Sequence, residues 1–222
     1  MEKPRVRIYT DYKSPYAFVA NAPLSALEEK EGVELEWLPY TLRIPEFMGT
    51  VEERTPHFWR KTRYLYMDAR RFANAQGLTL KGPRRIYNAF YSSAGMLFAQ
   101  RHGFFRPYHE TMFRRFWNHE LELDELAEIS AVIESLGGSA AEFETYVNGP
   151  ARAEHDRIID EAEALGVFGV PTMGDQGWFE YGGRLGFRIT QGWVADLFVN
   201  GTLGPQPVGN TIHGGVGLRV NY

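Results

Sequence analysis

Residues 5–19 read RVRIYTDYKSPYAFV, and this stretch decides how the rest of the chain is interpreted. Up to Thr10 the apolar and polar side chains alternate, which is the pattern of a half-buried β-strand. The dipeptide Ser14-Pro15 then predicts a helix start, because serine is a favoured N-cap and proline suits the first helical position. We therefore expect a strand, a short turn and a helix that begins at Ser14.

The hydroxyl group of Ser14 has two interpretations. The free N–H groups and the positive dipole at a helix start favour an anion such as a phosphate, a carboxylate or a thiolate, so Ser14 can take part in anion binding. Serine before proline is also a common helix start, and Ser14 can be no more than a cap. The third helical position is Ala17, so no glutamate or glutamine completes a capping box. The local sequence leaves both interpretations open.

Composition limits the class of protein. The 222 residues are 44% hydrophobic and 14% aromatic, enough to bury the core of one large domain or two small ones. The net charge of -4 and the pI of 5.9 argue against nucleic acid as a partner. No apolar run reaches about 18 residues and the first residues show no signal peptide, so we expect a soluble, cytoplasmic protein without a membrane partner. The chain has no cysteine, which excludes disulfides, cysteine nucleophiles and dithiol redox chemistry.

The order of the elements follows from periodicity. A strand pattern at 33–38 completes a parallel βαβ unit with the first strand and helix. From residue 46 to about residue 149 the strand pattern disappears and helical patterns replace it. The other expected elements are helices at 55–77, 83–103, 105–118, 124–136, 139–148, 151–165 and 189–199, and strands at 167–173, 177–181 and 216–220.

Two kinds of site find no support in the sequence. The six histidines lack the spacing of metal ligands, and the glycines form no GxGxxG motif, so we expect neither a metal nor a dinucleotide. A row of basic residues in the helix at 55–77 is either a solvated face or a set of contacts to the carboxylates of an acidic ligand. Its members are Arg60, Lys61, Arg63, Arg70 and Arg71.

Three segments carry a resemblance to a known family. The segments DYKSPYAF at 11–18, YLYMDARRFANAQGL at 64–78 and GVFGVPTM at 166–173 resemble the 2-hydroxychromene-2-carboxylate isomerases and their kappa-class glutathione transferase relatives. These proteins form a branch of the DsbA-like thioredoxin superfamily. The resemblance spans residues 5 to about 200 and implies an α/β, thioredoxin-like fold with a large all-helical insertion. The implied domains are a discontinuous thioredoxin-like domain at 1–45 and 150–203, an inserted helical domain at 46–149 and a C-terminal tail at 204–222.

The resemblance also implies which residues form the site. Ser14, the catalytic candidate, would bond the sulfur of glutathione and favour its thiolate. The candidates for glutathione binding are Val170, beside a cis Pro171, and Tyr181, Gly182, Gly183 and Arg184. The candidates for substrate binding are Tyr16, Arg54 and Lys61. The chain departs from the branch at two of these positions, because an acidic residue is usual at Gly183 and an asparagine is usual in the loop at Arg54.

The resemblance implies a glutathione-dependent isomerase of aromatic-ring degradation, in which the thiolate of the cofactor glutathione adds to a conjugated carboxylate substrate and leaves again. A kappa-like transferase, which keeps the thioether as its product, is one alternative. A non-catalytic thioredoxin-fold binding module, in which Ser14 is only a cap, is another. We also expect a homodimer, from the family and from an aromatic-rich segment that contains Phe104, Phe105, Phe113, Phe116 and Trp117.

Overall fold

The computed structural model describes residues 5–173, 179–190, 193–203 and 211–220. The chain divides after Gly174 into two compact units, and each is described by itself. The first unit contains β1 (Arg5–Thr10), α1 (Pro15–Glu31), β2 (Glu34–Pro39), α2 (Ile44–Met48), α3 (Pro56–Ala75), α4 (Phe90–Arg101), α5 (Phe105–Trp117), α6 (Leu126–Ser135), α7 (Ala140–Asn148), α8 (Ala151–Ala164) and β3 (Thr172–Met173). The second unit contains β4 (Phe179–Thr190), β5 (Trp193–Leu203) and β6 (Thr211–Val220). Within the described residues, no helix has the length and the apolar character that a membrane span requires.

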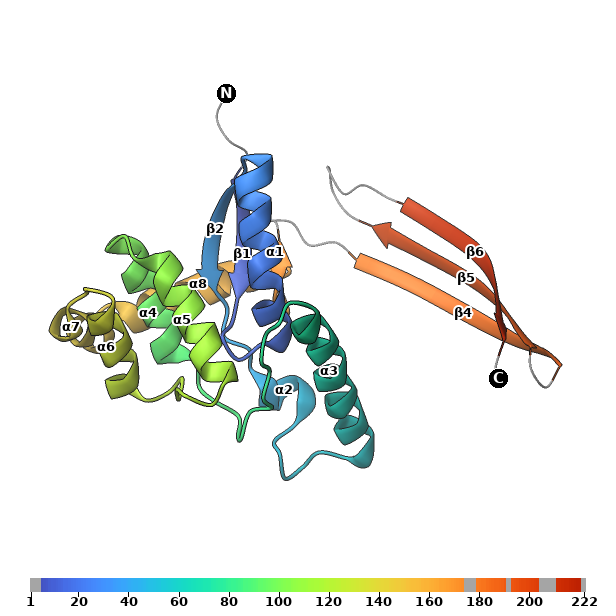
Figure 1. The fold of residues 1–222 in the computed structure, drawn as a ribbon, viewed down its shortest axis with the longest axis horizontal. Coiled ribbons are helices and arrows are strands. Elements are labelled where there is room, and N and C mark those ends of the chain that lie inside the picture. The colour runs from blue at the N-terminus through green and yellow to red at the C-terminus, as the bar shows by residue number, and fades with distance from the viewer. Residues whose placement is uncertain (1–4, 174–178, 191–192, 204–210, 221–222) are drawn as a thin grey trace. The chain divides into compact units, whose positions relative to one another are not determined.

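Three strands of the first unit form one sheet in the order β2-β1-β3 (Figure 1). Strands β1 and β2 run parallel, with Arg5 opposite Glu34, and α1 connects them. The predicted βαβ unit is therefore confirmed. Strand β3 pairs antiparallel with β1 and is shorter than the predicted strand at 167–173, because only its last two residues join the sheet. Pro171 has no N–H group to contribute to a strand ladder, which fits this late start.

Helix α1 begins and ends where the sequence predicts. Ser14 is the N-cap, with an extended backbone and a side chain that accepts the N–H of Ala17, and Pro15 follows it in the first turn. The helix stops at Gly32, whose φ of 63° lies in the left-handed region that glycine adopts readily. Local sequence thus determines both ends of this helix.

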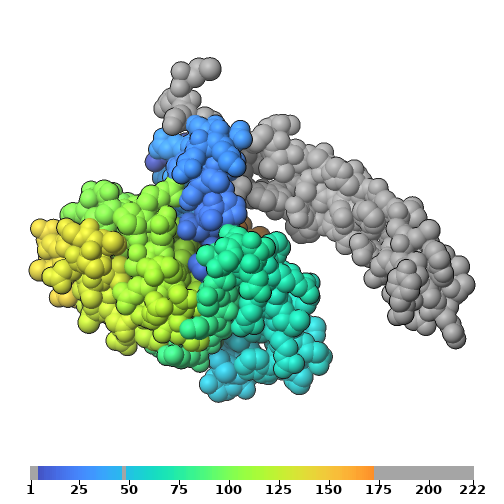
Figure 2. Space-filling view, viewed as in Figure 1, coloured from blue at the N-terminus to red at the C-terminus, as the bar shows by residue number. Residues whose placement is uncertain are grey.

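Helices α4 to α8, which we call the helical part, build the largest apolar core of the first unit. Nine of the twelve residues of α4 are buried, and α5 adds Met112, Phe113 and Trp117, each at most 1% exposed. In Figure 1 the green and yellow helices of this part lie to one side of β1 and β2, and the teal helix α3 lies near the lower end of α1. Figure 2 shows the green and yellow body and the teal segment packed against each other. The helical part is therefore a packed body next to the sheet.

The aromatic-rich segment at 104–117 does not have the surplus apolar surface on which the expected homodimer partly rested. Phe113, Phe116 and Trp117 are at most 3% exposed, and Phe104 and Phe105 pack against the same core while partly buried. This chain alone covers these rings, because Phe18 of α1 stacks on Phe113 and Trp117, and Trp37 of β2 contacts Phe105. These five residues therefore give no support to a dimer, and the dimer stays a prediction.

Helix α4 begins at Phe90 and not at the predicted residue 83. Residues before it form an irregular segment that is held by tertiary hydrogen bonds, from Arg70 Nε to the Leu80 carbonyl (3.0 Å) and from the Lys81 N–H to the Trp117 carbonyl (3.0 Å). Just before the helix, the side chain of Asn88 accepts the N–H of Phe90 (3.0 Å). The start signal of α4 is therefore the asparagine, and the proline at 83 belongs to the segment before it.

The second unit is an antiparallel meander in the order β4-β5-β6. Strand β4 pairs with β5 from Phe179 opposite Leu203 to Thr190 opposite Trp193. The helix predicted at 189–199 is wrong, because its residues lie at the end of β4 and in β5. The apolar residues of the run WVADLFV at 193–199 fit the spacing of a strand about as well as that of a helix. Periodicity alone does not distinguish a strand from a helix in so short a run. The strand predicted at 216–220 is confirmed as the last part of β6.

Candidate active site

The start of α1 is joined to the segment before β3. The Ser14 hydroxyl accepts the N–H of Ala17 (3.2 Å) and donates to the carbonyl oxygen of Val170 (3.2 Å), across 156 positions of sequence. Ser14 is 4% exposed, and the Val170-Pro171 peptide bond is cis. Three of the predicted site residues, Ser14, Val170 and Pro171, therefore lie together at a helix N-terminus.

A buried ion pair stands directly before this helix start. The Asp11 carboxylate accepts the main-chain N–H groups of Lys13 (3.1 Å) and Leu42 (2.8 Å), and its Oδ2 lies 3.4 Å from Lys13 Nζ. The two side chains are 0% and 4% exposed. Buried charges need such hydrogen bonds to offset their loss of water. Asp11 thus holds a buried ammonium group one residue away from Ser14.

Lys13 also lines a cavity of about 440 Å³, which we call the basic cavity. Its wall comes from the turn between β1 and α1, from α2, α3 and the loop between them, and from the irregular segment before α4. Six cations line it, and none of the lining residues is acidic. The lining residues are Lys13, Ile44, Val51, Arg54, Trp59, Thr62, Arg63, Leu65, Tyr66, Arg70, Gly82, Pro83, Arg84, Arg85, Ile86 and Tyr87.

The six cations differ in how their charges are balanced. Arg85 makes a bidentate pair with Asp124 (2.6 and 2.7 Å), and Arg84 lies 3.8 Å from a Glu122 carboxylate oxygen. Asp11 balances Lys13 in the same way. Arg54, Arg63 and Arg70 make no ion pair with any acidic residue of the described chain.

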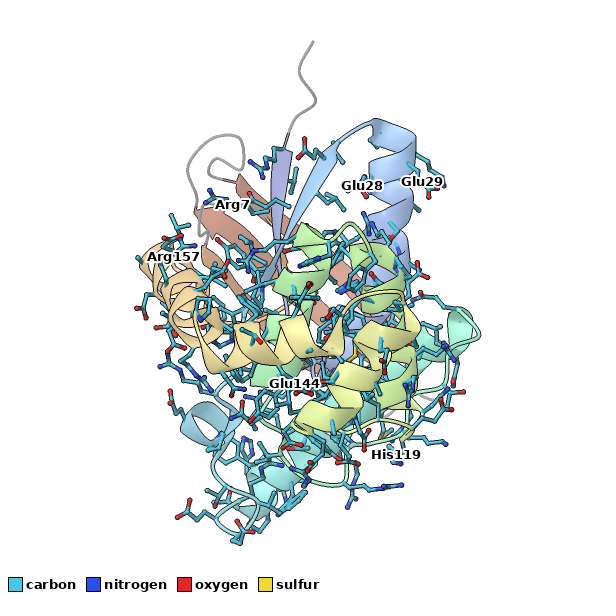
Figure 3. All side chains as sticks on the ribbon, turned by 90° about the vertical axis from the view of Figure 1, so that its left-hand side faces the viewer. Arg7, Glu28, Glu29, His119, Glu144 and Arg157 are labelled. Atoms are coloured by element: carbon cyan, nitrogen blue, oxygen red, sulfur yellow. The ribbon has the colours of Figure 1, made fainter. Side chains whose placement is uncertain are left out.

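The helical part holds one wall of the basic cavity in place. His119 Nε2 donates to the Gly82 carbonyl (2.7 Å), and Arg85 reaches Asp124 just before α6. Figure 3 shows His119 at the lower end of the helical part, far from Glu28 and Glu29 at the end of α1. The segment at 82–87 is therefore held in place by contacts outside the cavity, and its residues form a fixed wall.

The aromatic wall of the basic cavity is neutral. Burial raises the pKa of the Tyr66 hydroxyl to about 12, although the nearby charges of Arg54 and Arg70 act in the opposite direction. The Arg54 guanidinium lies 5.4 Å from the centre of the Trp59 ring, a cation–π distance. Tyr66 therefore stays protonated, and the positive charges of the cavity are not cancelled by a tyrosinate.

The structure places the other predicted site residues in different locations. Arg54 lines the basic cavity, whereas Lys61 is exposed on α3 and does not line it. The Tyr16 hydroxyl donates to Asp68 (2.8 Å), and burial and this bond raise its pKa to about 12, but Tyr16 does not line the cavity either. Tyr181, Gly182, Gly183 and Arg184 lie in β4 of the second unit, where their role stays a prediction.

Sequence reasoning missed several residues of the basic cavity. Lys13 stood in the decisive stretch but was interpreted only as part of a turn, and the signal that could have found it is its place between Asp11 and Ser14. Arg84 and Arg85 were assigned to a helix that does not exist there. Of the basic row on α3, Arg63 and Arg70 line the cavity, while Arg60, Lys61 and Arg71 do not. Among the described residues, no group of three acidic or histidine side chains could hold a metal ion.

Comparison with known proteins identifies the family. Residues 5–182 match the family described as DSBA-like thioredoxin domain. The chain belongs to this family. The predicted α/β thioredoxin-like fold with a helical insertion is thereby confirmed.

Several relatives in this family carry the name of an isomerase. A curated 2-hydroxychromene-2-carboxylate isomerase from Pseudomonas putida is 29% identical over 178 residues, which cover 78% of this chain and 87% of the relative. One from Pseudomonas sp. (strain C18) is 28% identical, covering 78% and 84%. A solved structure of a 2-hydroxychromene-2-carboxylate isomerase superposes with a TM-score of 0.65 at 28% identity, covering 78% of this chain and 86% of that one. These relatives support an isomerase.

Proposed function

We propose that the protein is a glutathione-dependent isomerase that acts on a carboxylate substrate from aromatic-ring degradation. The observation that carries the proposal is the Ser14 hydroxyl at the N-terminus of α1, bonded to the Val170 carbonyl and one residue from a buried ammonium group. A helix N-terminus, a hydroxyl donor and a cation all favour a thiolate over a thiol. The chain has no cysteine of its own, so the sulfur has to come from a ligand.

The residues at the helix start fit glutathione by an exchange of hydrogen bonds. When a thiolate lies at Ser14, the hydroxyl can turn from the Val170 carbonyl to the sulfur, and the freed carbonyl can accept a main-chain N–H of the tripeptide. Every buried polar group then keeps a partner, which is what a preformed site requires. Bound glutathione would supply a thiolate that adds reversibly to a conjugated double bond and so allows rotation about it.

The chain's own residues would position the substrate next to that thiolate. The basic cavity is lined by Lys13, which precedes Ser14 in the chain, and it joins cations to the aromatic rings of Trp59, Tyr66 and Tyr87. Such a wall suits a flat apolar body with a carboxylate, because the rings cover the body and the cations hold the charge. Positioning of the double bond against the sulfur is then the chief contribution of the protein.

The test is the pKa of the bound glutathione thiol, followed by the ultraviolet absorbance of the thiolate against pH. We expect a lowered pKa in the parent protein and a higher one in Ser14→Ala, because one charge-assisted hydrogen bond is lost. Ser139→Ala is the matched control, since Ser139 caps α7 by the same kind of bond to the Glu142 N–H (3.2 Å). An unchanged midpoint in a folded Ser14→Ala protein that still binds glutathione would reduce Ser14 to a cap.

Calorimetry with glutathione separates this proposal from the other two functions. A non-catalytic binding module predicts no glutathione binding by the parent protein. A kappa-like transferase predicts binding together with a stable thioether product, whereas the isomerase returns free glutathione and a rearranged substrate of the same mass. Mass spectrometry of the products distinguishes these two outcomes.

A further inference from the structure

The basic cavity contains more positive charge than one carboxylate requires. Of its six cations, Lys13, Arg84 and Arg85 each have a nearby acidic partner. The remaining three, Arg54, Arg63 and Arg70, have none among the acidic residues of the described chain, and no acidic side chain lines the wall. One carboxylate forms a full bidentate pair with a single arginine. A ligand with one charge would therefore leave at least two of these arginines unmatched.

The cations also lie at different depths. Lys13 is 5% exposed and Arg54 is half-buried, so both belong to the inner wall, whereas Arg63 and Arg70 are exposed and belong to the mouth. The Arg54 Nε atom is buried and has no hydrogen-bond partner among the described residues, and neither has the Thr62 hydroxyl. A buried donor without a partner is costly. The half-buried part of the wall thus offers unmet donors, and the exposed arginines offer further positive charge.

The rest of the wall is apolar and aromatic. Ile44, Val51, Leu65 and Ile86 line it together with Trp59, Tyr66 and Tyr87. The volume of about 440 Å³ lies in the range of about 300–1,000 Å³ that is usual for small-molecule sites. A flat ring system that carries charged groups matches a wall that combines apolar and aromatic side chains with several cations.

We propose that the basic cavity selects an aromatic substrate with two carboxylates, one held by the inner cations Lys13 and Arg54 and the other by Arg63 and Arg70 at the mouth. The reaction on this substrate rests on the proposed isomerase function, but the selection of the dianion does not. Cleavage of a dihydroxylated ring by dioxygen creates one carboxylate and one carbonyl group when it falls beside the two hydroxyl-bearing carbons, and two carboxylates when it falls between them. The class of reaction that supplies this substrate is therefore ring cleavage by dioxygen, either of the first kind on a ring system that already carries a carboxylate or of the second kind.

The experiment compares two probes of the same ring system, 2-naphthoate and naphthalene-2,6-dicarboxylate, by calorimetry without glutathione. We expect the dicarboxylate to bind about tenfold to a hundredfold more tightly, since one further charge-assisted hydrogen bond contributes about 1.5–3 kcal/mol. The preference should decrease with added salt, because the mouth cations are exposed. Equal affinities for the two probes, or binding of neither, would overturn the proposal.

Variants test whether the exposed arginines cause the preference for the dicarboxylate. Arg63→Gln removes an exposed arginine that is not part of the buried ion pair, so the protein should still fold. The preference for the dicarboxylate should fall by about tenfold, while the affinity for 2-naphthoate changes little. Arg157→Gln is the control, because it removes the same charge from the outside of α8, where Figure 3 shows Arg157. A full preference retained in Arg63→Gln would contradict the assignment.

The outcome is independent of the thiolate chemistry. Ser14→Ala should keep the probe preference, because neither probe needs the thiol. If the parent protein fails to bind glutathione but prefers the dicarboxylate, the proposed isomerase function fails and the dianion site stands. If glutathione binds and both probes bind equally, the dianion site fails and the isomerase stands.

Discussion

Helices α3 and α4 belong to the same unit, but the chain holds them in different ways. α4 buries nine of its twelve residues, whereas α3 buries only Ala69 and Ala73 of its twenty. On α3, Tyr64, Met67 and Phe72 remain 62%, 49% and 52% exposed. A narrow strip of small side chains and two polar contacts to α1, Asp68 with the Tyr16 hydroxyl and Gln76 with the Val19 carbonyl, hold α3.

This difference in burial indicates that α4 is part of a rigid scaffold and that α3 is a more mobile wall of the basic cavity. Elements with few buried contacts have the lowest local stability, and ligand-binding segments are drawn from them. α3 provides the exposed arginines Arg63 and Arg70 of the basic cavity, while the helical part fixes the opposite wall through His119 and Arg85. We therefore expect α3 to adjust when the cavity fills, and the helical part to stay as it is.

The largest expected effect is the loss of stability of the helical part in acid through His109. This side chain is 1% exposed, and burial, helped by the charge of Arg106, lowers its pKa from 6.5 to about 3. Protonation therefore favours the unfolded chain. The stability is complete above pH 6.5 and is lost as the pH falls towards 3, by at most about 1.4 kcal/mol per pH unit.

Urea unfolding at about pH 7 and about pH 4.5 measures this loss, which we expect to be roughly 2–3 kcal/mol. The Nδ1 atom of His109 lies 2.9 Å from the Tyr12 hydroxyl, and glutamine can make a similar bond without titrating in this range. The folded His109→Gln variant should lose less stability over the same pH interval. Equal losses in the two proteins would show that another group causes the acid effect.

Sequence predicted the parts of the fold that are encoded locally. Ser14-Pro15 and Gly32 set α1, and alternation set β1 and β2, because caps and periodicity act over a few residues. The sequence analysis placed the start of α4 at residue 83 because tertiary hydrogen bonds at Leu80 and Lys81, which no local pattern reports, hold the segment before the local start signal at Asn88. The strand at 193–203 was missed because strand pairing in the second unit decides it.

The candidate site shows the same limit. Ser14 and Val170 were found through short motifs whose contact the structure shows. The basic cavity joins Lys13 to residues 44–70 and 82–87, and no local pattern reports that these segments converge. Only the tertiary structure could show which arginines of α3 face the cavity and which face water.

The next effect tests the tight packing of α4. A Cβ atom at Gly95 would overlap the side chain of Tyr108, whose hydroxyl is tied to the Ser92 carbonyl (2.9 Å) and is fully buried. Overpacking costs about 1–3 kcal/mol, and the better helix propensity of alanine returns up to about 1 kcal/mol. Gly95→Ala should therefore lower the free energy of unfolding in urea by roughly 1–2 kcal/mol.

Gly169→Ala is the control for this change. A Cβ atom at Gly169 meets no atom within 4 Å, and the residue lies in an irregular segment. Its effect on the free energy of unfolding should stay within about 0.5 kcal/mol. A Gly95→Ala protein as stable as the parent would mean that α4 and α5 can move apart, which would remove the contrast with α3.

The smallest effect compares two helix caps of the same kind in the two regions. Thr55 accepts the Phe58 N–H (3.3 Å) at the start of α3, and Ser139 accepts the Glu142 N–H (3.2 Å) at the start of α7. Replacement of either by alanine removes a bond worth about 0.5–2 kcal/mol.

If α3 opens separately, Thr55→Ala should speed amide hydrogen exchange within α3 and barely change the global urea midpoint, because the lost stability then affects only the local opening of α3. Ser139→Ala should lower the global midpoint, because α7 unfolds with the core that contains Phe143. Equal global losses without faster exchange in α3 would place α3 in the same cooperative unit as α4, and the cavity would then have two rigid walls.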